Sequence, residues 1–370
     1  MKSNYVYGML TSLSLAAGCV SGANATAISG TLYFTSSSPE NVATGTLGNA
    51  SYTVFDATYN YNGSALSLGP VTGVASTTGS DGLLFAPNGN ILVAGQNNNL
   101  ISEVTTGGTN VGTVGAGTGS YHLALASNSP SSILYTMWNG STGGGSTSIA
   151  AVTLTNGGIV GSASGTPYTV SCATGHSTCS TDVRGVVYNA TNGKWYYGTS
   201  SDSVAGDFGT VVFDNVNHTA TLTPLLTNIA AHGLSYDPFS GDIITNMGTT
   251  INQIQVSLDG STATVVSTFT SPTTTRFDQA AVTGTGQLFV ASGTGTMQFI
   301  DYSASGLIGS GTNYSSSNFL INALDDVAPL SGTGSNQTAA PEPISMALFG
   351  TGALGLGWVR RRRGNRIARA

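Results

Sequence analysis

Chemically reactive side chains recur at one position of a repeated sequence pattern. Only 7% of the 370 residues are charged, so acidic and basic groups at equivalent positions stand out. Three carboxylates and a histidine brought together would bind a divalent cation through oxygen atoms, or a polar sugar. The residues at this position are Asp81, Tyr121, Arg184, His232, Asp278 and Asp326, with His122 and Asp325 next to two of them.

We predict that five of these residues form a ligand-binding site: Asp81, Arg184, His232, Asp278 and Asp326. The carboxylates of Asp81, Asp278 and Asp326 are the predicted metal ligands. The alternative is that all of them line a water-filled channel and bind nothing. The sequence contains no Gly-x-Ser-x-Gly, His-Glu-x-x-His or phosphate-loop motif, so triad hydrolases, zinc proteases and nucleotide enzymes lack support.

The repeats that carry these residues are predicted β-hairpins. Each has a short alternating strand, a turn with glycine, and a second strand of β-branched or aromatic residues. Their starts lie 40 to 63 residues apart, and repeats of about 40–50 residues with several strands are typical of propeller blades. Clear copies pair residues 81–85 with 89–93, 184–188 with 193–197, 232–236 with 241–244 and 278–282 with 286–290, and weaker copies begin at residues 121 and 326.

The last repeat stops after its inner strand, whereas strand-like residues 31–34 and 52–55 have no inner strand of their own. We therefore expect the N-terminal strands to complete the last blade of an all-β, six-bladed β-propeller over residues 26–330. The pattern resembles the six-bladed NHL, streptogramin-lyase and gluconolactonase-like propellers. The alternative, suggested by the same excess of Gly, Ser, Thr and Asn, is a β-solenoid adhesin, although solenoid coils are nearer 20–30 residues.

The resemblance implies two kinds of chemistry. Lactonase-like propellers use a carboxylate-rich, calcium-type site that includes a glutamate, so calcium is the expected cofactor. Neither glutamate of the body, Glu40 or Glu103, begins a repeat, and this departure weakens the case for a lactonase. A streptogramin-type lyase uses a histidine as general base, and His232 is the aligned candidate for a catalytic residue.

Basic residues are concentrated at the two ends of the chain. Six of the ten Lys and Arg residues lie in the last eleven positions, and Lys2 is at the start. The body, residues 26–330, retains three basic residues against fifteen acidic ones, a formal charge of −12. Nucleic-acid binding needs a basic stripe, so we exclude a nucleic-acid partner.

Residues 1–25 contain the parts of a secretory signal peptide in their usual order, and a signal peptidase would remove them. Lys2 precedes a mostly apolar stretch over residues 6–20, and small residues occupy the cleavage positions before a cut after Ala25. Two alternatives remain: a buried helix, or attachment of a lipid to Cys19.

The C-terminal segment, residues 341–370, has three parts in a fixed order. Pro341-Glu342-Pro343 precedes sixteen mostly apolar residues, 344–359, and the arginines Arg360, Arg361, Arg362 and Arg363 follow. As a helix the apolar part would span about 24 Å, short of the ~30 Å hydrocarbon core, and the arginines would stay cytoplasmic with the body outside. Residues 331–340 are the predicted flexible linker.

This order of parts resembles the PEP-CTERM sorting domain. The resemblance implies recognition by an exosortase-type membrane protease and transient anchoring through a short transmembrane helix. It also implies delivery to the cell surface or extracellular matrix of a Gram-negative, exopolysaccharide-producing bacterium. The alternative is an ordinary tail anchor.

The longest spacing between repeats contains Cys172 and Cys179. Two cysteines seven residues apart in an exported protein predict a disulfide, and the alternative is a zinc site that also uses His176. Taken together, these features predict an exported binding or structural propeller associated with exopolysaccharide. The alternative is a metal-assisted lyase or lactonase that acts at the mouth of the propeller channel.

Overall fold

The computed structural model describes residues 27–41, 51–95, 98–117, 119–126, 129–137, 148–176, 179–201, 204–273 and 276–329. The predicted signal peptide, the linker and the predicted sorting helix lie outside these ranges. Within them, no helix has the length and apolar character needed to cross a membrane.

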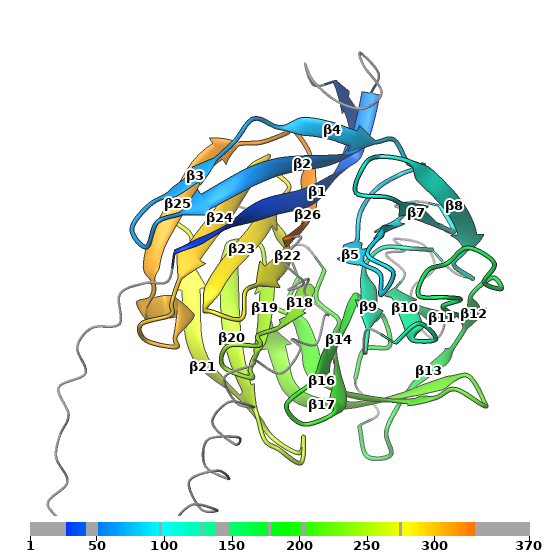
Figure 1. The fold of residues 1–370 in the computed structure, drawn as a ribbon. Coiled ribbons are helices and arrows are strands. Elements are labelled where there is room, and N and C mark those ends of the chain that lie inside the picture. Colours follow the sequence, from blue (N-terminus) through cyan, green and yellow to red (C-terminus); the bar gives the residue numbers. More distant parts are fainter. Residues whose placement is uncertain are drawn as a thin grey trace, which may run out of the picture.

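Short strands separated by turns rich in Gly, Asn, Ser and Thr make up the described body, as expected for residues that favour strand edges and turns. The strands form six sheets of four or five strands each, arranged around a common centre (Figure 1). We number these sheets as blades in the order in which their inner strands occur along the chain.

Blades 1 to 3 come from residues 83–229. Blade 1 contains β5 (Leu83–Phe85), β6 (Ile91–Ala94), β7 (Leu100–Val104) and β8 (Asn110–Gly115). Blade 2 contains β9 (Leu123–Leu125), β10 (Ile133–Met137), β11 (Ile149–Thr153) and β12 (Thr166–Pro167). Blade 3 contains β14 (Gly185–Asn189), β15 (Lys194–Gly198), β16 (Gly206–Asp214) and β17 (Thr219–Ile229), with β13 (Thr169–Cys172) on its outer edge.

Blades 4 to 6 complete the ring. Blade 4 contains β18 (Gly233–Tyr236), β19 (Ile243–Met247), β20 (Thr250–Val256) and β21 (Ala263–Thr270). Blade 5 contains β22 (Phe277–Val282), β23 (Gln287–Ser292), β24 (Thr296–Asp301) and β25 (Thr312–Phe319), with a 3-10 turn η1 (Ile308–Ser310). Blade 6 contains β26 (Leu324–Pro329), β1 (Ile28–Asn41), β2 (Ser51–Tyr61), β3 (Leu66–Leu68) and β4 (Thr72–Ala75).

The apolar core is divided among the spaces between blades. Leu92 of blade 1 packs in one cluster with Leu134 of blade 2, and Ile251 of blade 4 packs with Val290 of blade 5. Burial of such side chains contributes about 1.5–3 kcal/mol each, so every blade is stabilised by its neighbours.

Strands from both ends of the body close the ring. β26 pairs antiparallel with β1, as in Phe34 opposite Val327, and β1 pairs with β2. Both carboxylate oxygens of Glu40 accept backbone N–H groups, from Ala323 and Asn322, each at 2.9 Å. The predicted six-bladed propeller with N-terminal closure is confirmed, and the β-solenoid alternative is wrong.

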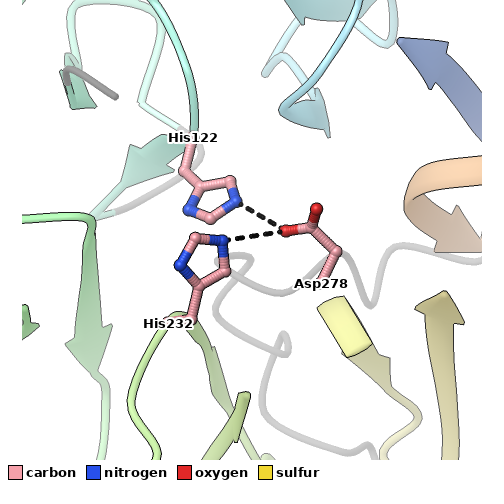
Figure 2. Close-up of side chains that lie close together, drawn as sticks. All are labelled: His122, His232 and Asp278. Atoms are coloured by element: carbon pink, nitrogen blue, oxygen red, sulfur yellow. Dashed lines mark hydrogen bonds and ion pairs between the residues drawn. The ribbon is translucent and has the colours of Figure 1, made fainter. Parts of the chain in front are cut away.

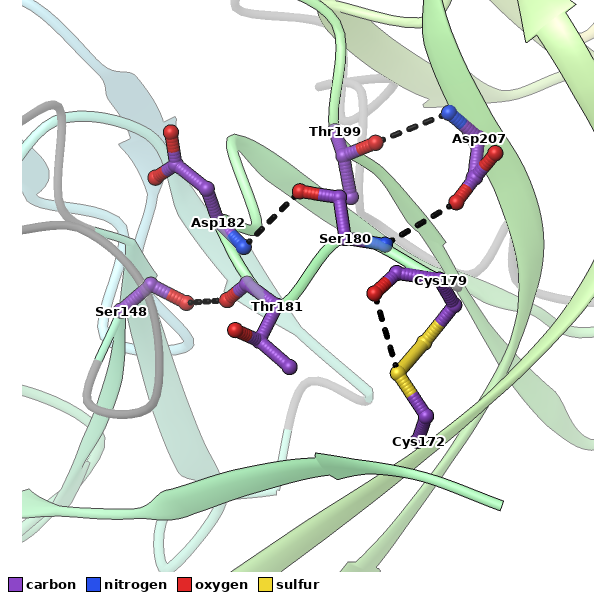
Figure 3. The surroundings of a disulfide bond; sticks show 8 residues. All are labelled: Ser148, Cys172, Cys179, Ser180, Thr181, Asp182, Thr199 and Asp207. Carbon is purple, nitrogen blue, oxygen red and sulfur yellow. Dashed lines mark hydrogen bonds between the residues drawn. A yellow bond between two sulfur atoms is a disulfide. The ribbon is translucent and has the colours of Figure 1, made fainter. Parts of the chain in front are cut away.

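The long spacing between the second and third repeats forms an outer strand and a small loop. β13 pairs parallel with β17, and Cys172 at its end is bonded to Cys179 with the two Cα atoms 6.0 Å apart (Figure 3). The next residue, Ser180, donates its N–H to Asp207 at 3.1 Å, which ties the loop to blade 3. The two sulfurs are therefore directed at each other, as in a disulfide, and not at a shared zinc ion. Formation of this disulfide in the exported protein remains a prediction.

Candidate metal centre

The predicted site residues meet because every inner strand begins at the same mouth of the channel. Neighbouring inner strands contact one another around the ring, which brings their first residues together. Asp81, His122, Arg184 and His232 lie just before β5, β9, β14 and β18, whereas Asp278 and Asp326 lie in β22 and β26.

Glycine follows several site residues because adjacent inner strands approach closely at this mouth. Gly82 donates its N–H to the carbonyl oxygen of Tyr121 at 2.8 Å, and a Cβ at position 82 would overlap that carbonyl. A Cβ at Gly233 would likewise overlap the carbonyl oxygen of Asp278. These glycines set the separation between the site residues of neighbouring blades.

One carboxylate oxygen is the centre of the cluster. Oδ1 of Asp278 lies 3.1 Å from Nε2 of His122 and 3.4 Å from Nε2 of His232 (Figure 2). Both histidines are 1% exposed, whereas the Asp278 side chain keeps 14% of its surface. Asp278 is therefore the group through which the cluster meets solvent.

Backbone carbonyls orient both imidazole rings. Nδ1 of His122 lies 3.0 Å from the carbonyl oxygen of Arg184, and Nδ1 of His232 lies 3.0 Å from that of Ser200. A carbonyl oxygen only accepts hydrogen bonds, so each Nδ1 carries the hydrogen. In a neutral ring the lone pair is then on Nε2, which lies near Oδ1 of Asp278 in both histidines and also near the Tyr121 hydroxyl in His232.

A second group of possible ligands shares His122. Its Nε2 lies 3.9 Å from Oδ1 of Asp81, and one oxygen of Asp326 completes a set of three atoms within 4.8 Å of one another. Oδ2 of Asp326 accepts the Leu83 N–H at 3.1 Å. Oδ1 of Asp326 is buried without a hydrogen-bond partner among the described residues, which is costly unless a proton or a cation satisfies it.

Burial, hydrogen bonds and neighbouring charges shift the pKa values of these groups in different directions. Burial lowers the pKa of His122, more than the hydrogen bond and charge of Asp278 raise it. Burial raises the pKa of Asp278, but its hydrogen bonds and charge interactions with His122 and His232 outweigh burial and leave the pKa well below the usual range. Burial, together with the charges of Asp278 and Asp325, raises the pKa of Asp326 well above its usual value.

The residues fit a divalent transition metal. Nitrogen and oxygen ligands about 2.1 Å from a tetrahedral or octahedral ion stand about 3.0–3.4 Å apart, which matches the separations around Asp278. Metal-binding histidines usually donate their other ring N–H to a carbonyl or carboxylate, as both rings do here. Two nitrogen ligands favour Zn²⁺, Mn²⁺ or Fe²⁺ over the calcium expected from the sequence, because calcium prefers oxygen.

Not all of the predicted site residues contribute a side chain to the two groups of ligands. Asp81, His232, Asp278 and Asp326 all contribute side chains to the two groups of ligands. Arg184 instead directs its guanidinium to Asp182, 2.7 Å away, and reaches the cluster through its backbone carbonyl. Tyr121 contributes its hydroxyl, 2.9 Å from Nε2 of His232.

His122 is the ligand that sequence reasoning did not select. It follows Tyr121 directly, and both residues precede β9. Strict alternation along a strand would place their side chains on opposite faces, but both rings contact His232, with centroids 5.6 and 5.2 Å from it. The presence of a histidine beside the repeat start was the available signal.

A comparison with protein-family models finds the PEP-CTERM protein-sorting motif over residues 339–363. The predicted sorting motif is thereby confirmed. The chain is an exported protein with a β-propeller body that exosortase-type machinery processes, and it is anchored in a membrane transiently.

Several solved structures resemble the fold at low sequence identity. No curated protein matches the sequence. A protein from Lactobacillus plantarum is 11% identical with a TM-score of 0.46, covering 80% of this chain and 83% of that one. Virginiamycin B lyase from Staphylococcus aureus is 10% identical with a TM-score of 0.44, covering 79% and 90%. A gluconolactonase from Xanthomonas campestris is 8% identical with a TM-score of 0.41, covering 65% and 78%.

Proposed function

We propose that this exported propeller holds a divalent transition-metal ion at its channel mouth, with His122, His232 and Asp278 as ligands. The observation that carries the proposal is the arrangement of the two histidines: each Nδ1 is fixed by a carbonyl, and each Nε2 points to the same oxygen of Asp278. Without a proton or a cation between them, the Nε2 lone pair of His122 and the Asp278 carboxylate would repel each other. Asp81 and Asp326 supply further oxygen ligands beside the ion.

The metal centre would act as a binding site at the cell surface or in the extracellular matrix of a Gram-negative bacterium. Exopolysaccharide is the proposed partner, because its hydroxyl oxygens are suitable ligands for the ion's remaining positions. The partly exposed side chain of Asp278 supports access from solvent.

A second candidate is a metal-assisted lyase or lactonase. The Tyr121 hydroxyl beside Nε2 of His232 favours it, because this pair can accept and pass on a proton at the edge of the cluster. A bound ion would polarise a carbonyl oxygen of the substrate. The same Nε2 cannot bind the ion and accept a proton, so in this candidate Asp81, His122 and Asp326 hold the ion and His232 is the base.

Metal analysis and calorimetry of the purified exported protein test the proposal with Zn²⁺, Mn²⁺ and Ca²⁺. We expect one transition-metal ion per chain and weaker binding of Ca²⁺. His122→Gln and Asp278→Asn should each weaken zinc binding at least about 100-fold, since loss of a ligand costs more than loss of its supporting hydrogen bond. Asp214→Asn, at the end of β16 and outside the cluster, is the matched control and should bind like the parent. Binding that is unchanged in both ligand variants, or no binding of any of the three ions, would refute the metal centre.

His232→Gln separates the two functions. If His232 is a ligand, the variant loses zinc affinity as His122→Gln does. If His232 is a base, the variant keeps the ion but loses turnover of lactones and other cyclic esters. Polysaccharide binding without turnover in the parent protein supports the first function.

A further inference from the structure

A second concave site lies between blades 2, 3 and 4, with a volume of about 410 Å³. The lining residues that matter here are Tyr135, Lys194, Trp195, Phe213, Asn215 and Asp259. They come from β10, β15, β16, the turn after β16 and the turn after β20, so three blades build the pocket.

The pocket is at the opposite face of the propeller from the metal centre. Arg184 precedes β14 at the channel mouth, and Gly185 at the start of this strand pairs with Gly198. Lys194 pairs with Asn189 at the other end of β14, beside the pocket. The two sites therefore lie at opposite ends of the same strands.

Three aromatic rings form one wall. Tyr135 and Phe213 stack with their centroids 4.0 Å apart and an angle of 17° between their planes. Trp195 packs edge-on against both, at 4.9 Å from Tyr135 and 5.6 Å from Phe213. Trp195 and Phe213 are only partly buried, so the wall is accessible to a ligand.

Hydrogen-bonding groups surround this wall. Oδ1 of Asn215 accepts the hydroxyl groups of Tyr135 and Tyr168 at 3.0 and 2.8 Å, which directs the amide N–H donors away from them. Lys194 adds a cationic donor, and the exposed Asp259 adds an acceptor. The pocket thus combines an aromatic surface with both donors and acceptors.

Exposed apolar side chains gather at the same place. Val216, Leu258 and Val212 are 86%, 77% and 67% exposed, the largest values for large apolar side chains in the described part of the chain. Val212 lines the pocket, and the other two lie next to lining residues in sequence. Apolar groups left in water in this way mark an interaction surface.

We infer that this pocket binds sugar residues of a neutral polysaccharide. A pyranose ring has an apolar face of C–H groups and a rim of hydroxyls, which matches an aromatic wall bordered by an amide, an ammonium and a carboxylate. A volume of about 410 Å³ is at the lower end of small-molecule sites and holds one or two such rings. The body charge of −12 disfavours an acidic polymer. The inference rests on the proposed association with polysaccharide, but it does not depend on the metal ion.

Titration of the purified exported protein with cellohexaose, mannohexaose and an acidic oligogalacturonate tests this inference by calorimetry. We expect one of the two neutral hexasaccharides to bind. Trp195→Ala and Val212→Glu should weaken that binding about tenfold or more, as expected for central contacts of a binding site. Val212→Glu changes an exposed side chain, so it tests the site even if Trp195→Ala fails to fold.

Val204→Glu is the matched control. Val204 is 65% exposed, close to the value for Val212, but it lies in the loop between β15 and β16 at the other end of the blade. This variant should bind the hexasaccharide within twofold of the parent. The parent protein should bind the hexasaccharide with the same affinity in the presence of a metal chelator, so failure of the metal centre and failure of the sugar site are distinguishable.

Three results would overturn the inference. One is the absence of binding by either neutral hexasaccharide. Another is parental affinity in Val212→Glu. The third is self-association of the parent protein that Val212→Glu abolishes in sedimentation, because the surface would then bind a second copy of the chain.

Discussion

Replacing Gly233 with alanine should disturb both the ring and the metal centre. Gly233 begins β18 opposite Asn246, and its added Cβ would overlap the carbonyl oxygen of Asp278 and lie 2.8 Å from the amide oxygen of Asn246. Overpacking of this kind costs about 1–3 kcal/mol. For a domain of this size, about 2 kcal/mol corresponds to a Tm lower by roughly 3–6 °C.

The overlap can be relieved only if β18 and β22 move apart. This movement would separate His232 from Asp278, whose interacting atoms are 3.4 Å apart, so zinc affinity should fall together with Tm. Gly107→Ala is the control, because position 107 is exposed and the nearest atom to its added Cβ is Oγ1 of Thr105 at 3.8 Å. It should leave Tm within about 1 °C of the parent value.

Scanning calorimetry and zinc titration measure the two effects separately. If Gly233→Ala has the same Tm as Gly107→Ala, close approach of the inner strands does not explain why glycine occupies position 233. If its Tm falls while zinc affinity is unchanged, the separation of these strands does not control the metal centre.

Three further predictions concern other parts of the chain. Burial raises the pKa of Glu103, but hydrogen bonds from two asparagine side chains and two backbone N–H groups outweigh it and lower the pKa. This carboxylate therefore stabilises the fold above its unfolded pKa of about 4.3, and the contribution is lost as pH falls through the lower folded pKa. In chemical unfolding, Glu103→Gln should be less stable than the parent by about 1–2 kcal/mol at pH 7, with a difference that shrinks below pH ~4. Mass spectrometry of non-reduced, alkylated protein should find Cys172 and Cys179 protected, and two alkylated thiols would contradict the disulfide. Replacing residues 341–343 with alanine should leave membrane insertion intact but prevent release of the body, as measured by fractionation of cells, and normal release would contradict the sorting mechanism.

The sequence was sufficient to predict the blades because their signal is local. Each hairpin combines an alternating strand with a glycine turn, and the spacing of the copies predicts how many surround the channel. Ring closure followed from counting strands, since residues 31–34 and 52–55 lacked an inner strand and the last repeat lacked outer ones. The confirmed pairing of β1 with β26 connects those two observations.

The metal centre was less predictable because side-chain direction depends on the local backbone conformation. Alternation along a strand would place Tyr121 and His122 on opposite faces, but both precede β9 and both contact His232. Arg184 illustrates a different limit, because its guanidinium forms an ion pair with Asp182, two residues earlier, instead of facing the cluster. The pocket on the far face was missed because Trp195, Phe213 and Asp259 belong to strands and turns that only the folded ring brings together.

The arrangement of ligands connects the metal centre to the stability of the ring. His122, His232 and Asp278 come from blades 2, 4 and 5, and the carbonyls that orient both histidines come from blade 3. An ion bound by these three side chains would link blades that are not all neighbours, whereas each apolar cluster links adjacent blades. Because such an ion would bind only when the ring is closed, it would stabilise the closed ring by mass action. Each of the three ligands should therefore contribute to the same stabilisation of the ring. Since one substitution already removes most of it, two ligand substitutions together should lower the free energy of unfolding little more than one.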